Sequence, residues 1–425
     1  MLWRAVMPDL LQISWATIWI TSAEVGRSAM NDADPRRTFD AIVIGAGVVG
    51  ACCAHYLIEA GLQVAIIDRG SVASGTTGAG EGNILVSDKE PGPELDLALL
   101  SRRLWFDLID VIGDRAELEP KGGVVIAHDD ATLTRLREFA EVQRAAGVEA
   151  HDVDPMQLRE LEPHINPQIL GGVHYPQDMQ TQPMLAAAHL IARGVQSGRL
   201  SRMTDTEVIE IIRDESGRVT GVRTPSDGIS APIVVNAAGT WGGQVAALAG
   251  VDLPILPRRG FLLVTEPLPI TVHHKVYAAD YVANVASDNE GLETSAVIEG
   301  TRGGTILIGS SRERVGFDAT LDWSIVQRLA AQAVEVFPML AGVQLLRTYG
   351  GFRPYCPDHL PVIGADARVP GLMHACGHEG AGVGLAAATG YLIAQAITGR
   401  SLDLPLEPFA PVRFDSTPER VGAHA

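Results

Sequence analysis

Two kinds of hydrophobic pattern alternate along the chain. Short unbroken apolar runs, as in Ala41–Ile44 and within Gly61–Arg69, predict buried strands. Longer stretches such as Glu94–Ile112 and Ala131–Ala146 place apolar residues at helical spacing, which predicts helices with one buried face. A chain in which strands and helices alternate in this way is typical of an α/β fold.

The pattern continues beyond residue 120 and predicts a second sheet. Gly122–Ala127 reads as a strand that begins this sheet, and residues 208–222 read as a hairpin with its turn at Glu215–Gly217. The other predicted elements are the helices Gln182–Gly198 and Trp323–Phe337, the strands Ile233–Asn236, Phe261–Glu266 and Thr305–Gly309, and a helix that starts within Gly380–Thr389. No repeat or low-complexity linker separates these elements, so we expect two interleaved domains.

A glycine-rich turn follows the first predicted strand. The sequence DAIVIGAGVVG places Gly45, Gly47 and Gly50 around Val48 and Val49, where a helical stretch begins. In a dinucleotide-binding turn, the first glycine allows a tight bend, the second lets backbone approach a pyrophosphate, and the third lets the helix pack on the strand. The segment therefore predicts a nucleotide site.

Asp68 strengthens this prediction. It ends the second predicted strand, just before Arg69, at the spacing from Gly45 where a carboxylate binds the ribose hydroxyls of a dinucleotide. An ordinary strand–turn–helix would explain the glycines, but it would not explain this carboxylate.

The composition of the loop at residues 70–83 favours a flavin cofactor over a nicotinamide cofactor. It is rich in small and hydroxyl residues, with Thr76 and Thr77 ahead of Glu81, Gly82 and Asn83. Its amides and hydroxyls can bind phosphate and ring oxygens, and its glycines leave room beside a flat ring. A flexible surface loop is the alternative interpretation.

Composition agrees with a soluble globular protein of more than one domain. The chain has 425 residues, of which 46% are hydrophobic and 20% charged. Its formal charge of −18, without a basic run, argues against a nucleic-acid partner. The four cysteines lack CxxC or metal-ligand spacing, so we expect reduced thiols and no metal site.

The first 37 residues precede the first predicted strand and are treated as an extension. Their apolar stretch, Leu10–Ile20, is too short to span a membrane, and Asp9 opposes a secretion signal. Met30 is an alternative start that would make residues 1–29 dispensable. A secretion signal and a partner-binding arm are the other interpretations, and we expect a cytoplasmic location.

Several ordered motifs resemble those of the FAD-dependent amino-acid and amine oxidoreductases, the family that includes glycine oxidase, sarcosine oxidase and D-amino-acid dehydrogenase. The resemblance covers about residues 39–399. Its motifs are the nucleotide turn, GTTGAGEGN in the following loop, VVNAAGTW at 234–241, LPRRG at 256–260, GFRPYCPDHLPVIG at 351–364 and ACGHEGAGVGLAAATG at 375–390.

The resemblance implies a Rossmann-like FAD-binding domain interleaved with an α+β substrate domain that is built on a mixed sheet. The FAD-binding domain would comprise residues 38–115, 168–250 and 347–405. The substrate domain would comprise residues 116–167 and 251–346, and residues 406–425 would form a tail.

FAD is therefore the expected cofactor, bound without a covalent link. Gly351 occupies the position at which cysteine-linked sarcosine oxidases carry the flavin-bonded residue, and a link through Cys356 is the alternative. The backbone of Val208 would meet the adenine. The residues expected to bind FAD are Gly45, Gly47, Val48, Val49, Gly50, Asp68, Arg69, Thr76, Thr77, Glu81, Gly82, Asn83, Val208, Ala238, Gly239, Trp241, Gly380, Gly382, Val383 and Gly384.

Arg353 is the first of three expected catalytic residues. It matches the arginine that binds the substrate carboxylate in family members that oxidise amino acids, and a guanidinium holds a carboxylate bidentately. A structural bridge between Arg353 and Asp358 is the alternative.

His378 and Tyr355 complete the expected catalytic set. His378 would be either a proton acceptor or a residue that fills a hydrogen-bonding position. Tyr355, like Tyr277 and Tyr281, would either line the pocket or pack in the core.

The resemblance implies oxidation of the C–N bond of a small amino or imino acid by hydride transfer to flavin N5, followed by hydrolysis of the imine. Glycine oxidase carries an arginine where this chain has Gly380, which weakens an assignment to glycine. A 2-hydroxy-acid dehydrogenase and a non-catalytic flavoprotein subunit are the alternatives.

The HEGAG and GAGEGN sequences are more similar to catalytic subunits of heteromeric opine, D-hydroxyproline and cyanide-forming glycine dehydrogenases than to free-standing oxidases. The resemblance therefore implies partner subunits that carry other redox centres. A homo-oligomer and contact with a membrane through a quinone acceptor are the alternatives. The residues do not separate these possibilities.

Overall fold

The computed structural model of the protein describes residues 38–285 and 287–415. The predicted extension at 1–37, with Leu10–Ile20 and Met30, lies outside the described residues, as do residues 416–425 of the predicted tail. The first residues of that tail, up to Asp415, form two short 3₁₀ turns, in which Phe409 is buried.

The first sheet contains six strands in the order β18-β19-β12-β1-β2-β8. Its strands are β1 (Ala41–Ile44), β2 (Val64–Ile67), β8 (Leu200–Met203), β12 (Val234–Asn236), β18 (Val362–Ala365) and β19 (Leu372–Cys376). All neighbouring pairs are parallel except β18 and β19. Parallel pairing aligns the carboxyl ends of β1, β2 and β12 along one edge, where ligands bind in folds of this type.

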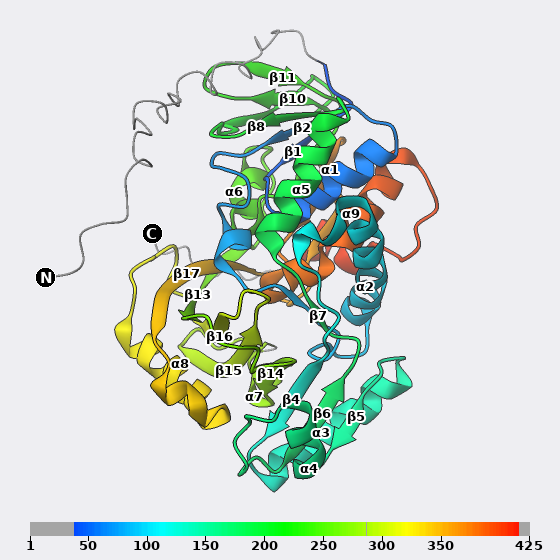
Figure 1. The fold of residues 1–425 in the computed structure, drawn as a ribbon. Helices are drawn as coiled ribbons and strands as arrows, with labels where there is room; N and C mark the ends of the chain where they lie inside the picture. Colours follow the sequence, from blue (N-terminus) through cyan, green and yellow to red (C-terminus); the bar gives the residue numbers. More distant parts are fainter. Residues whose placement is uncertain (1–37, 286, 416–425) are drawn as a thin grey trace, which may run out of the picture. The chain divides into compact units, whose positions relative to one another are not determined.

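Helices cover one face of this sheet. Figure 1 shows α1 (Val48–Glu59), α5 (Pro183–Gln196) and α9 (Gly382–Thr398) gathered on one side of β1 and β2, and α2 (Pro93–Ile112) packs on α9. Ala41 and Val43 of β1 enter the core beneath these helices. Burial of the sheet on both faces explains why its strands read as unbroken apolar runs.

The other face of β1 packs against a smaller unit. Ile42 and Ile44 join a cluster with Ile211 and Val222, which lie on a three-stranded antiparallel sheet. The members of that sheet are β9 (Glu210–Arg213), β10 (Val219–Arg223) and β11 (Gly228–Ser230), and α6 (Gly242–Ala247) adds Ala246 to the same cluster. β9 and β10 are the predicted hairpin, with the chain reversing between Asp214 and Arg218.

The second sheet has eight strands in the order β17-β13-β16-β15-β14-β4-β6-β5. Its strands are β4 (Gly123–Ala127), β5 (His151–Val153), β6 (Gly171–Tyr175), β13 (Leu256–Thr265), β14 (Lys275–Ala278), β15 (Glu293–Gly300), β16 (Ile306–Arg312) and β17 (Leu345–Tyr355). It is antiparallel except for β14 and β4, so the predicted mixed sheet is confirmed.

Helix α8 (Trp323–Val336) covers this second sheet on the side opposite the first domain. Its buried face, which includes Ile325 and Leu329, packs against Phe261 and Leu263 of β13. The helices α3 (Asp130–Ala145), α4 (Pro155–Leu161) and α7 (Asp280–Val285) complete the set near this sheet.

Two strands fall on the other side of the expected domain boundaries. β6 and β17 lie within ranges that we assigned to the FAD-binding domain, but both belong to the second sheet. β17 pairs with β13 from Leu256↔Tyr355 to Thr265↔Leu345. Because this pairing joins segments far apart in the sequence, periodicity alone did not reveal it.

Residues 379–398 form a helix that is long and apolar enough to cross a membrane by composition alone. Most of this helix is buried, and α9 within it contacts both α1 and α2. A helix that is hydrophobic on all sides is also typical of a domain core. The packing of α9 accounts for its composition.

Candidate active site

A cavity of about 530 Å³ lies between the two sheets, at the carboxyl ends of β1, β2 and β12. The turn after β1, the loop after β2 and the segment after β12 form one side of it. Gly260 and Leu262 of β13 and Arg353 of β17 form the other side. The cavity therefore joins the nucleotide turn to residues of the second sheet.

The glycine turn is shaped by close approach of backbone. Gly45 has φ +113°, and a Cβ there would lie 2.4 Å from the carbonyl oxygen of Ala237. A Cβ on Gly50 would lie 1.9 Å from the carbonyl oxygen of Gly45. The first and third glycines thus let β1, β12 and α1 meet, as the sequence predicted.

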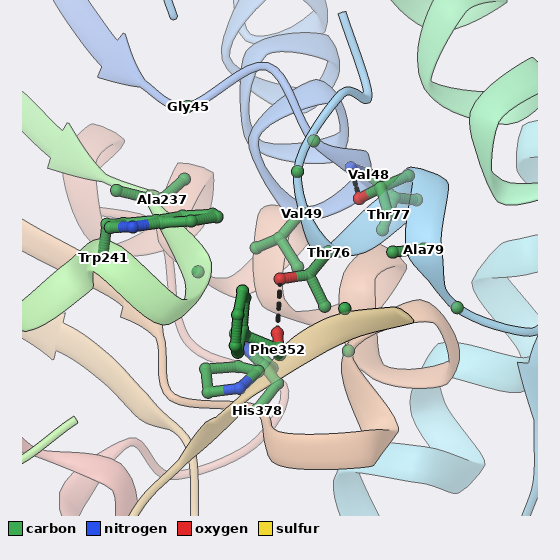
Figure 2. Close-up of a pocket in the computed structure, with 18 of the residues that line it drawn as sticks. Gly45, Val48, Val49, Thr76, Thr77, Ala79, Ala237, Trp241, Phe352 and His378 are labelled. Atoms are coloured by element: carbon green, nitrogen blue, oxygen red, sulfur yellow. Dashed lines mark hydrogen bonds between the residues drawn. The ribbon is translucent and has the colours of Figure 1, made fainter. Parts of the chain in front are cut away.

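Gly47 lies at the opening of this turn, beside the following loop. A Cβ on Gly47 would lie 2.9 Å from Thr77 Oγ1, which accepts a hydrogen bond from the Val48 amide at 3.0 Å (Figure 2). The start of α1 therefore faces the cavity through a residue without a side chain. A helix N-terminus of this kind provides amides and positive potential for a phosphate.

Asp68 holds the end of β2 against the glycine turn. Its carboxylate accepts hydrogen bonds from the amides of Ala46 at 2.7 Å and Gly70 at 2.8 Å, and the residue lines the cavity. Each carboxylate oxygen retains acceptor capacity after these bonds. Asp68 can therefore organise the turn and still accept from ribose hydroxyls.

The loop at 70–83 is fixed to the second sheet by a threonine. Thr76 Oγ1 donates to the carbonyl oxygen of Phe352 at 2.8 Å, as Figure 2 shows. The Arg69 guanidinium lies 4.4 Å from the centroid of the Trp241 ring, and this ring also stacks on Phe317 with 5.7 Å between the centroids. The loop is anchored and does not behave as the flexible surface loop of the alternative interpretation.

Two buried oxygen atoms within the cavity have no hydrogen-bond partner among the described residues: Glu81 Oε1 and Asn83 Oδ1. The other oxygen of Glu81 is held by Asn83 Nδ2 at 2.9 Å and Lys275 Nζ at 3.2 Å. A buried acceptor without a donor costs free energy, so these atoms are suited to donors supplied by a ligand.

The start of α9 forms another wall of the cavity. Gly380, Gly382 and Val383 line it, and the preceding residue, Glu379, is held in a left-handed conformation with φ +45°. The side chain of Glu379 is fixed by Arg258 Nη1 at 2.7 Å. The positive end of a 17-residue helix therefore faces the ligand space.

Arg353 projects into this cavity from β17. Its Nη1 donates to the carbonyl oxygen of Ser311 at 2.8 Å, and no carboxylate of the described chain lies within 4.0 Å of its guanidinium. The alternative bridge to Asp358 is not formed, because Asp358 accepts from Arg413 Nε at 2.6 Å. Burial and the nearby charge of Arg312 lower the pKa of Arg353 to about 10, which leaves it charged at neutral pH.

His378 also lines the cavity, as Figure 2 shows. Its Nε2 lies 3.0 Å from Thr389 Oγ1, and burial lowers its pKa to about 3. The imidazole is therefore neutral at physiological pH and fills a hydrogen-bonding position.

The three tyrosines expected either to line the pocket or to pack in the core occupy different positions. Tyr281 lines the cavity, whereas Tyr277 is fully buried and forms a hydrogen bond with Ser87 Oγ. Tyr355 does not line the cavity, because its hydroxyl donates to Asp288 Oδ1 at 3.0 Å. The expectation that Tyr355 is a catalytic residue is therefore corrected, because Tyr355 lies outside the cavity.

These features occur in a chain that matches the family described as DAO, FAD dependent oxidoreductase, over residues 40–396. This protein belongs to that FAD-dependent oxidoreductase family. It is 29% identical to the hydrogen cyanide synthase subunit HcnC of Pseudomonas aeruginosa, and the alignment covers 92% of this chain and 99% of HcnC.

Solved structures show the same fold. The crystal structure of glycine oxidase from Geobacillus kaustophilus has a TM-score of 0.80 at 26% identity, covering 88% of this chain and 99% of that one. L-proline dehydrogenase from P. horikoshii has a TM-score of 0.80 at 24% identity, covering 89% and 98%. The predicted Rossmann-like α/β fold with a mixed sheet is confirmed.

FAD is the cofactor of this family, and the cavity fits it. The glycine turn provides amides for the pyrophosphate, Asp68 provides acceptors for a ribose, and the start of α9 provides positive potential at the opposite end. The unpartnered oxygens of Glu81 and Asn83 fit ring or ribose donors. None of the four cysteines lines the cavity, and Cys356 is buried beside Arg413, which argues against a link through its sulfur.

Most of the expected site residues meet at this cavity. Those that line it are Gly45, Gly47, Val48, Val49, Asp68, Arg69, Thr76, Thr77, Glu81, Asn83, Val208, Ala238, Gly239, Trp241, Arg353, His378, Gly380, Gly382 and Val383. Gly50, Gly82 and Gly384 do not line it and instead allow close packing behind the wall. A Cβ on Gly82, for example, would lie 1.7 Å from the carbonyl oxygen of Thr181.

Sequence reasoning missed lining residues on distant elements. These residues include Gly260 and Leu262 of β13 and Phe352 of β17. Which side of each strand faces the cavity depends on the pairing of β13 with β17. Arg312, at the end of β16, was also missed; it does not line the cavity but lies over Tyr281, which does. A charged residue that ends the apolar run ILIGSS was the signal that could have indicated it.

Proposed function

We propose that this protein oxidises the C–N bond of a small amino or imino acid. The observation that carries the proposal is Arg353, a partly buried guanidinium in the cofactor cavity that lacks a carboxylate partner within the described residues. A buried charge without a counter-ion is costly, and a substrate carboxylate would offset that cost with paired, charge-assisted hydrogen bonds.

The name of a similar protein supports this substrate class. The solved structure at 26% identity is named a glycine oxidase, an enzyme that acts on an amino acid.

FAD, when bound, supplies the acceptor for the hydride that leaves the amine-bearing carbon. Arg353 would orient the substrate by holding its carboxylate, so that this carbon faces the ring. The second sheet covers the cavity and restricts water. His378, which is neutral and bonded to Thr389, keeps the start of α9 in place, and the helix dipole favours negative charge on a reduced ring.

The test compares Arg353→Lys and Arg353→Met with a control on the same strand, Arg347→Met. Arg347 is exposed and its guanidinium lies over Tyr349, outside the cavity. Loss of bidentate binding should raise KM for the substrate by roughly 100-fold or more in Arg353→Met and by less in Arg353→Lys, because each charge-assisted bond contributes about 1.5–3 kcal/mol. The control should keep the wild-type KM.

The substrate is found by anaerobic reduction of the bound flavin with D- and L-amino acids, sarcosine, proline isomers and 2-hydroxy acids. Bleaching by an amine alone supports the proposal, and bleaching by a 2-hydroxy acid alone contradicts it.

HcnC is named a subunit, which supports a partner protein as electron acceptor. Rapid reoxidation on admitting air would contradict that part.

A further inference from the structure

A further arginine, Arg312, is buried close to Tyr281, which lines the same cavity as Arg353. It ends β16 and is 4% exposed, and its guanidinium lies 5.1 Å from the ring centroid of Tyr281. Tyr281 lines the cavity, whereas Arg312 contacts Tyr281 without itself lining the cavity. Within the described part of the chain, no carboxylate lies within 4.0 Å of Arg312.

Arg312 and Arg353 are close enough for their charges to interact. Arg353 Nη1 donates to the carbonyl oxygen of Ser311, the residue before Arg312. The charge of Arg312 is, after burial, the main cause that lowers the pKa of Arg353. Burial raises the pKa of Tyr281, and the charges of both arginines act against this rise. Arg312 thus contacts Tyr281 directly, and the charge of Arg353 also acts on this tyrosine at the cavity wall.

Nearby buried arginines of the same sheet are paired. Arg258 binds Glu379 at 2.7 Å and Glu293 at 3.2 Å. Arg259 binds Glu313 at 2.8 Å and Asp318 at 2.9 Å. Arg258 and Arg259, which have structural roles, are thus each paired with carboxylates of the protein itself.

No such carboxylate accompanies Arg312 or Arg353 in the described residues. Glu81 and Asp280 are the carboxylates whose charges act on Arg353 and Arg312, but neither forms an ion pair with them. Two like charges without directly bound carboxylates destabilise the folded state, and a ligand that carries two negative groups would offset this cost. A ligand with one carboxylate would leave one guanidinium unpaired.

We propose that Arg312 and Arg353 bind the two carboxylates of one substrate, so that the protein acts on an amino or imino acid with a second, distal carboxylate. This rests on the proposed function, in which Arg353 binds the carboxylate next to the reacting carbon. Arg312 is then the residue that selects acidic substrates over neutral ones.

The test measures binding of unreactive acids to the FAD-loaded protein by calorimetry and by the change in the flavin spectrum. Succinate is compared with butyrate, and glutarate with pentanoate, because each pair has the same chain length. The wild type should bind the better dicarboxylate at least about tenfold more tightly than its matched monocarboxylate.

The variants are Arg312→Met, Arg312→Lys and Arg353→Met, with Arg347→Met as the control. Arg312→Met should lose the preference for the dicarboxylate while its Kd for the monocarboxylate stays unchanged. Arg312→Lys should keep part of the preference, since it retains the charge without the planar donor pair. The control should behave as the wild type.

Equal affinities of the wild type for the two acids of both pairs would overturn the inference, and this comparison requires no variant. Retention of the preference in Arg312→Met would also overturn it, and would leave Arg312 a structural partner of Tyr281. If Arg353→Met leaves monocarboxylate binding unchanged, the proposed function itself fails, whatever the result at Arg312.

Discussion

Among the individual residues of the cavity, burial acts on His378 and Arg353 with different consequences. It lowers the pKa of both, to about 3 for His378 and to about 10 for Arg353. At neutral pH the imidazole is therefore uncharged and the guanidinium remains charged. The first can hold a hydrogen bond to Thr389, and the second can attract an anion.

A neutral His378 leads to a prediction about pH dependence. Between pH 6 and 8, His378 does not change its charge in the free enzyme, so it should contribute no inflection to the profile of log kcat/KM. His378→Asn, which can retain a hydrogen bond to Thr389, should give a profile of the same shape, measured with the substrate found by flavin reduction. An inflection near pH 6.5 that disappears in the variant would contradict this prediction.

At the level of elements, the cavity depends on the close crossing of α1 and α9. A Cβ on Gly390 of α9 would lie 2.5 Å from the carbonyl carbon of Cys52 and 2.7 Å from the amide nitrogen of Cys53, both in the backbone of α1. Because backbone cannot move aside as a flexible side chain can, glycine sets the distance between the two helices. Both helices begin at the cavity, so their separation affects the cofactor site.

Gly390→Ala should therefore push α9 away from α1. We expect a loss of about 1–3 kcal/mol in the free energy of unfolding, as for other overpacked cores, together with weaker retention of FAD. Denaturant titration and the flavin content of the purified protein measure these effects.

Gly342→Ala is the matched control, because no atom lies within 4 Å of a Cβ built there. Its stability and flavin content should equal those of the wild type. A Gly390→Ala variant as stable as this control would show that the crossing tolerates a methyl group.

At the scale of the whole molecule, Asp178 connects segments that belong to different sheets. It lies between β6 and β7 (Met179–Gln180) and accepts hydrogen bonds from the amide of Val86 at 2.9 Å and from Ser87, whose hydroxyl also contacts Tyr277 of β14. Burial raises the pKa of Asp178 from 3.8 to about 7, although these hydrogen bonds act in the opposite direction.

This raised pKa predicts how stability changes with pH. Between pH 4 and 7 the folded protein keeps the proton on Asp178 while the unfolded chain releases it, so the contribution of this residue falls as pH rises and levels off above pH 7. Asp178→Asn, which cannot ionise, should remove that part of the slope. Denaturant titrations of both proteins at pH 5, 6, 7 and 8 measure the difference, and parallel curves would contradict the prediction.

The sequence alone determined the local units of this protein. Gly45, Gly50 and Asp68 act within one strand–turn–helix–strand unit, where contacts join residues close in the chain, so their spacing predicts their geometry. Helical periodicity likewise placed α2, α3, α5 and α8 close to their observed ends, because the buried face of a helix repeats along its own sequence. The GFRPYCPD motif predicted that Arg353 belongs to the site, but it did not predict which residues lie around Arg353.

Only the tertiary structure decided which distant segments meet. It placed β17 in the second sheet, turned Tyr355 towards Asp288, paired Asp358 with Arg413 and brought Arg312 beside Arg353. These outcomes depend on strand pairing and packing between residues far apart in the chain, for which local periodicity carries no information. The chemistry of the nucleotide end and the role of Arg353 could thus be predicted from sequence, whereas the position of Arg312 could not.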